Sequence, residues 1–88
     1  MRIDVTLNRL CLTHSRNEAK NACEAGAIFV GGKPAKASQM VTAGAIVTLR
    51  FTHRLLEVRL LELPHRSISK KVAREMYEVV RDERIASE

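Results

Sequence analysis

The chain has 88 residues, with 15 lysines and arginines against 10 aspartates and glutamates and a formal net charge of +5. This length allows one small domain and leaves no room for a separate catalytic domain. No apolar run approaches the roughly 20 residues of a membrane-spanning helix, and residues 1–8 lack the apolar core of a signal peptide. We therefore expect a cytoplasmic protein in which Cys11 and Cys23 stay reduced.

Two short helices are predicted at the N-terminus. Asp4 is the expected N-cap of the first, which should run to about Leu12. The second should begin at the segment LTHSRNEAK, because Ser15 and Glu18 form the S-x-x-E pattern of a capping box. Small residues then recur at helical spacing over residues 19–26, so the second helix can pack closely against the first.

An antiparallel sheet is predicted next. Residues 27–30 are short and apolar, and the two glycines that follow them predict a tight turn. Residues 45–51 and 55–63 alternate between apolar and polar positions, joined by a hairpin connection. Alternation places one set of apolar side chains on a common face in each strand: Val47, Leu49 and Phe51, then Leu56, Val58 and Leu60.

The tail returns to a helical period. Residues 67–84 carry an apolar stripe through Val72, Met76 and Val79, with oppositely charged residues spaced four apart on the other face. The predicted fold is therefore α+β: two short N-terminal helices packed on a small antiparallel sheet, with a C-terminal helix. We divide the chain into a domain over residues 1–63 and a helical extension over residues 64–88.

The sequence gives little support for catalysis or for metal binding. His14, His53 and His65 lie in three different connections, and none has a carboxylate or cysteine partner at triad or ligand spacing. Cys11 and His14 alone supply too few metal ligands. The glycine pair before Lys33 lacks the longer frame of a phosphate-binding loop. We therefore predict no catalytic residue, no metal site and no cofactor, and assign no role to the histidines.

The positive charge points instead to a polyanion. Residues 1–50 hold seven lysines and arginines against three acidic residues, whereas residues 51–88 hold eight against seven. Such an excess favours nucleic acid ahead of an anionic membrane. One tyrosine, two phenylalanines and no tryptophan argue against a platform that stacks single-stranded bases. Four cations cluster on the two short helices, namely Arg2, Arg9, Arg16 and Lys20.

These segments resemble a known family. RID at residues 2–4, SRNEAK at 15–20, EAGAIFVGGKPAKAS at 24–38 and AGAIVTLRF at 43–51 are similar to the S-four RNA-binding domain. The resemblance covers about residues 1–62. It implies RNA contacts by the arginine of the Arg-x-Asp start, here Arg2, and by the arginine of the Ser-Arg pair, here Arg16.

The remaining residues resemble one branch of that family. A chain of this length with LLEVRLLEL and AREMYEVVRDER is similar to the bacterial ribosome-associated quality-control protein P family and to the small ribosome-associated heat-shock proteins. The resemblance implies binding to large ribosomal subunits that carry a stalled peptidyl-tRNA. We expect a non-enzymatic factor with large-subunit rRNA and peptidyl-tRNA as partners. The expected RNA-binding residues are Arg2, Arg9, Arg16, Lys20, Lys33 and Lys36.

Two alternatives remain open at the level of sequence. The chain could be an RNA-binding accessory module that works with an rRNA- or tRNA-modifying enzyme, since S-four domains also occur attached to such enzymes. A protein partner could also dock on the C-terminal helix, with the basic patch incidental. The expected assembly state is a monomer.

Overall fold

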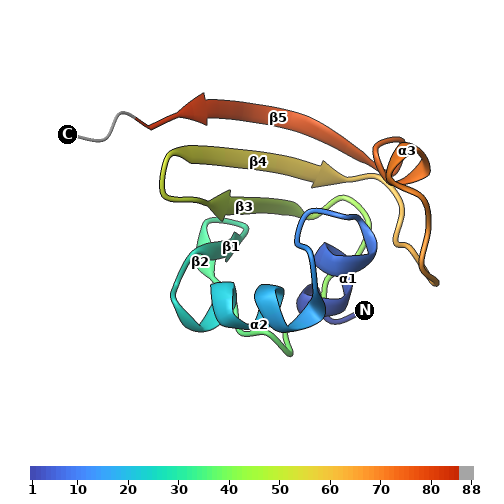
Figure 1. The fold of residues 1–88 in the computed structure, drawn as a ribbon, viewed down its shortest axis with the longest axis horizontal. Helices are drawn as coiled ribbons and strands as arrows, with labels where there is room; N and C mark the ends of the chain where they lie inside the picture. The colour runs from blue at the N-terminus through green and yellow to red at the C-terminus, as the bar shows by residue number, and fades with distance from the viewer. Residues whose placement is uncertain (86–88) are drawn as a thin grey trace.

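The computed structural model describes residues 1–85 and has an α+β architecture, as predicted (Figure 1). The helices are α1 (Ile3–Arg9), α2 (Arg16–Glu24) and α3 (Lys70–Ala73), and the strands are β1 (Ile28–Val30), β2 (Lys33–Pro34), β3 (Ile46–Arg50), β4 (Arg54–Leu60) and β5 (Tyr77–Arg84). The strands form one antiparallel sheet in the order β2-β1-β3-β4-β5. Over residues 1–85, no helix has the length and apolarity needed to cross a membrane.

The two N-terminal helices begin differently. The Ser15 hydroxyl accepts a hydrogen bond of 3.0 Å from the amide of Glu18, which confirms the predicted cap of α2. The prediction that Asp4 caps α1 is wrong, because the N-cap is Arg2 and its side chain makes no capping bond. Asp4 lies instead inside the first turn of α1 and is buried.

The hydrophobic core lies between the helices and one face of the sheet. Ile3 and Leu7 of α1 are fully buried against it. The predicted alternation is confirmed at five strand positions, all buried: Val47, Leu49, Leu56, Val58 and Leu60. Phe51 follows the last residue of β3, where the chain turns into the hairpin toward β4, and its side chain is 38% exposed.

The predicted glycine turn is confirmed. Gly31 and Gly32 have φ angles of +60° and +82° and lie between Val30 and Lys33, which are paired across β1 and β2. A two-residue hairpin loop with positive φ at both positions is a type I′ turn, which matches the twist of the strands. Glycine adopts these angles without a steric penalty, so the local sequence determines this hairpin.

The predicted helix over residues 67–84 is wrong for most of its length. Ser69 caps α3, which has only four residues, and Tyr77–Arg84 forms β5. Seven residue pairs join β5 to β4, with a register shift between Glu57 and Val58. Residues 77–84 form a strand because β4, whose apolar side chains lie in the core, would otherwise be the unpaired edge of the sheet. The aromatic and β-branched residues of β5 also favour a strand. The division of the chain at residue 63 stays a prediction.

Candidate nucleic-acid interface

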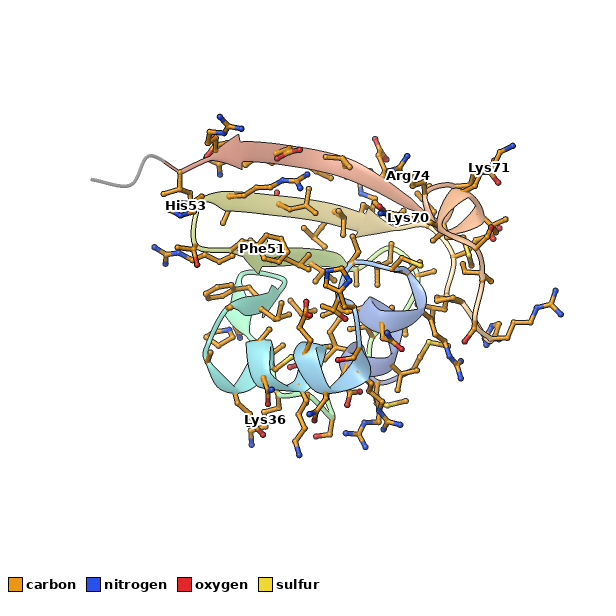
Figure 2. The ribbon with its side chains drawn as sticks, in the orientation of Figure 1. Lys36, Phe51, His53, Lys70, Lys71 and Arg74 are labelled. Carbon is orange, nitrogen blue, oxygen red and sulfur yellow. The ribbon has the colours of Figure 1, made fainter. Side chains whose placement is uncertain are left out.

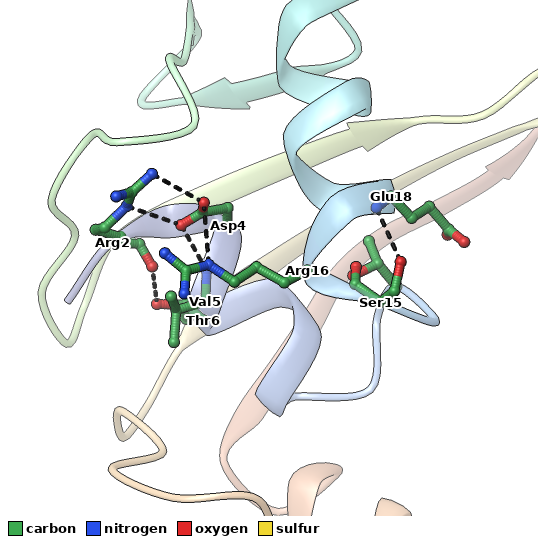
Figure 3. Close-up of polar contacts among 8 residues, drawn as sticks. Arg2, Asp4, Val5, Thr6, Ser15, Arg16 and Glu18 are labelled. Atoms are coloured by element: carbon green, nitrogen blue, oxygen red, sulfur yellow. Dashed lines mark hydrogen bonds and ion pairs between the residues drawn. The ribbon is translucent and has the colours of Figure 1, made fainter.

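A buried carboxylate organises the start of α1. Asp4 is 1% exposed, and its two oxygens accept hydrogen bonds of 3.2 and 3.1 Å from Nε and Nη2 of Arg2 (Figure 3). It also accepts a bond of 2.8 Å from the amide of Val5. Nε of Arg16, at the first position of α2, lies 3.5 Å from the same carboxylate. Asp4 therefore holds two arginines from different helices close together.

The loop after β2 fixes this arrangement from the other side. The amides of Ile3 and Asp4 donate to the carbonyls of Gln39 and Ala37, at 2.8 and 3.3 Å. The Thr6 hydroxyl donates to the Arg2 carbonyl at 2.8 Å. The two backbone bonds hold residues 37–39 against the beginning of α1, and so bring the loop that carries Lys36 beside Arg2.

An open groove of about 670 Å³ lies between α2, the start of α1 and this loop. Three cationic residues line it, Arg2, Lys20 and Lys36, with Glu24 as the single acidic residue among its lining. The Arg2 and Arg16 side chains are 43% and 57% exposed, so both still reach solvent despite their contact with Asp4. Pre-positioned guanidinium groups beside flexible lysines suit binding to phosphate oxygens.

The thiol of Cys23, which lines the groove, is not reactive. Burial raises the pKa of the Cys23 thiol, and the negative charges of Asp4 and Glu24 raise it further. The thiol therefore stays protonated at neutral pH and is a poor nucleophile. Within residues 1–85, no group of three or more histidine, cysteine or acidic side chains is arranged to hold a metal ion.

Three of the six predicted RNA-binding residues do not line this groove: Arg16 is connected to it only through Asp4 and Arg2, and Arg9 and Lys33 lie elsewhere. Nη1 of Arg9 donates to the carbonyl of Pro64 at 3.1 Å, so it ties α1 to the segment after β4. Lys33 is exposed on the edge strand β2 and does not line the groove. The structure therefore brings together four of the six: Arg2, Arg16, Lys20 and Lys36.

Sequence reasoning missed the contribution of Asp4. Its position two residues after Arg2 is visible in the sequence, but an acidic residue at that place also suits a helix start. The contact with Arg16 depends on how α1 packs against α2, which the sequence does not display. Asp4 is therefore a positioning residue for the basic site, whereas it was expected to be a cap.

These features together define a small RNA-binding module, in which two helices and a loop present arginines and lysines around a groove. A family model described as S4 domain matches residues 1–47. The RQC P-site tRNA stabilizing factor of Halalkalibacterium halodurans is 35% identical over 86 residues, which cover 98% of this chain and 97% of that protein. The factor of the same name from Bacillus subtilis is 34% identical over 85 residues, 97% of this chain and 98% of the relative. This chain belongs to the S4 domain family, in the branch of the RQC P-site tRNA stabilizing factors.

Solved structures agree with this assignment. The trimeric structure of Vibrio cholerae Heat Shock Protein 15 matches with a TM-score of 0.86 at 26% identity, over 91% of this chain and 81% of that one. A hypothetical protein solved in solution matches with a TM-score of 0.79 at 30% identity, over 94% of this chain and all of the other. The similarity extends well beyond residues 1–47 and so includes the outer strands of the sheet.

Proposed function

We propose that this chain is a non-enzymatic RNA-binding factor that associates with the large ribosomal subunit in the quality control of stalled nascent chains. The groove lined by Arg2, Lys20 and Lys36, with Arg16 joined to it through Asp4, is the observation that carries the proposal. The names of these relatives support P-site tRNA as a ligand beside rRNA. Such a factor acts in the cytoplasm.

The proposed mechanism is electrostatic docking. Phosphates of structured RNA would enter the groove and replace part of the water around its cations, while bound counterions leave the RNA. Because Asp4 already orients Arg2 and Arg16, little side-chain freedom would be lost on binding. The role of the protein would be to hold RNA in place, which needs complementary shape and charge and no reacting group.

The test is co-sedimentation of Arg16→Ala with purified large subunits over a range of salt concentrations. We expect weaker binding and a log–log salt slope lower by about 0.9, the value for one lost phosphate contact. Arg81→Ala is the matched control, because Arg81 is a similarly exposed arginine that pairs with Glu83 on β5. Binding of Arg16→Ala equal to that of wild type would contradict the proposal. A stable complex with an RNA-modifying enzyme, without ribosome association, would favour the accessory-module function.

The proposal also covers the surface that a protein partner would contact and the oligomeric state of the chain. The partner surface expected on a C-terminal helix would instead be presented by β5, because that segment is a strand. A monomer is predicted, whereas the Vibrio cholerae relative is described as trimeric. Light scattering of the purified chain, alone and bound to large subunits, measures its assembly state directly.

A further inference from the structure

A second groove, of about 550 Å³, lies beside the segment that follows α1, whereas the first lies beside the residue that precedes it. One wall is the segment that follows α1, at Cys11 and Leu12. The other wall is formed by α3 and by strands β4 and β5. Figure 2 places Lys70 and Arg74 at the end of the molecule beside α3, far from Lys36 below α2. The two grooves therefore open toward different surroundings.

The sheet geometry explains why this groove is open. Leu56 and Val58 of β4 face the core, and Val79 and Tyr77 of β5 pair with Val58 and Leu60 on that same face. Helices α1 and α2 cover the sheet at β1 and β3, whereas β5 lies at the opposite edge (Figure 1). The face therefore continues past the helices, and Val79 is left 52% exposed.

The charge of this groove is positive. Lys70 and Arg74 line it four residues apart, and neither forms an ion pair with any other residue of the described part of the chain. Arg54 also lines it but donates twice to Asp82, at 2.8 and 2.7 Å, so its charge is largely balanced. No acidic residue is among the lining. Lys70 and Arg74 therefore supply the net charge that an anion would meet.

Two of the three aromatic residues of the chain also line this groove. Phe51 stands at the end of β3 and is partly exposed, and Tyr77 begins β5 beside α3. The low aromatic content of the sequence excludes a base-stacking surface only if the rings are dispersed. The fold gathers Phe51 and Tyr77 around one cationic surface, which is the combination that binds unpaired nucleotides.

We propose that this second groove binds an unpaired segment of RNA, with phosphates on Lys70 and Arg74 and a base against Phe51. The proposal rests on the proposed function, because it adds a second RNA contact to the same factor. An acidic peptide would satisfy the two cations but would gain little from the exposed ring of Phe51, so charge and aromatic surface together favour RNA. One small domain could then hold a structured RNA in the first groove and an unpaired strand in the second.

The test is an amide NMR titration of the full chain with an oligonucleotide of eight uridines. We expect saturable shifts at residues 51–56 and 70–79 in wild type. Lys70→Gln combined with Arg74→Gln should raise the dissociation constant at these amides by at least about tenfold. Phe51→Ala should raise it by about fivefold or more, because a stacked base is lost. Lys71→Gln is the matched control, since Lys71 is an adjacent α3 cation outside the groove lining. It should leave the dissociation constant unchanged.

Two further arms separate this proposal from the proposed function. Arg16→Ala should retain the shifts at residues 70–79 even where it loses binding to large subunits. Failure of the second groove to bind RNA and failure of the first groove to bind large subunits can therefore be told apart. An oligoglutamate peptide with the charge of the oligonucleotide should produce no comparable shifts. Equal shifts with oligoglutamate would assign the groove to acidic protein segments and overturn the proposal. An equal loss of affinity in Lys71→Gln would also overturn it, because binding would then follow overall charge.

Discussion

Two bidentate arginine–carboxylate pairs in this domain have similar geometry and very different surroundings. Arg2 donates to Asp4 at 3.2 and 3.1 Å at the start of α1, and Arg54 donates to Asp82 at 2.8 and 2.7 Å across β4 and β5. The carboxylate of Asp4 is 1% exposed, whereas the side chain of Asp82 is 45% exposed. The shorter pair is thus the one that water screens more strongly.

Burial should therefore decide what each pair contributes. Water competes for both partners of the exposed pair, so the pair contributes little to folding. The buried carboxylate would lose its partners without replacement by water, which makes each of its hydrogen bonds costly to remove. Asp4 also contacts Arg16, so it links two helices as well as two residues of the candidate RNA site. The pair between Arg54 and Asp82 joins only neighbouring strands.

The largest expected effect tests whether the residues after Pro64 form an extension that can be removed without unfolding the rest of the domain. A chain that ends at Pro64 loses α3 and β5, so β4 becomes an exposed edge and Val58 and Leu60 lose covering contacts. We expect a loss of more than about 3 kcal/mol in the free energy of unfolding, measured by urea denaturation. An unchanged midpoint would show that the N-terminal region folds without β5. The result also decides whether truncation can be used to map partners.

A smaller effect sharpens the comparison of the two carboxylates. Asp4→Asn keeps the side-chain shape but removes the charge that holds Arg2 and Arg16, and we expect a loss of about 2 kcal/mol in the free energy of unfolding. The matched variant Asp82→Asn should lower it much less, because water screens the exposed pair. Denaturant unfolding of the two variants under the same conditions makes the measurement. Equal losses would mean that burial does not separate the pairs.

The sequence predicts the N-terminal half of this fold well, because the signals there are local. The Ser15 hydroxyl reaches an amide three residues away, and the Gly31-Gly32 turn needs only its own two φ angles. Strand alternation likewise identifies the buried face of β3 and β4. Arg2 and Arg16 could also be proposed from local charge, but their common contact with Asp4 could not, because it joins α1 to α2.

The tail shows where local reasoning stops. Spacings of four residues among its apolar and charged side chains suit a helix, yet Tyr77, Val79 and Val80 suit a strand equally well. The choice is made by β4, which is distant in the sequence and needs a partner along its outer edge. The second groove could not be predicted for the same reason, since its lining combines Phe51, Lys70 and Tyr77 only after β5 has paired.

The smallest expected effect is a pH dependence of the exposed pair. The hydrogen bonds from Arg54 lower the pKa of Asp82; desolvation opposes them by a smaller amount, and the attraction of the Arg54 charge lowers the pKa further. A carboxylate whose pKa is lower in the folded state stabilises folding above its unfolded value of about 3.9, and this contribution is lost as the pH falls through the folded pKa. The thermal midpoint of Asp82→Asn should therefore lie slightly below that of wild type at pH 7, and the difference should vanish in acid. A difference that grows in acid would contradict the assigned direction of the shift.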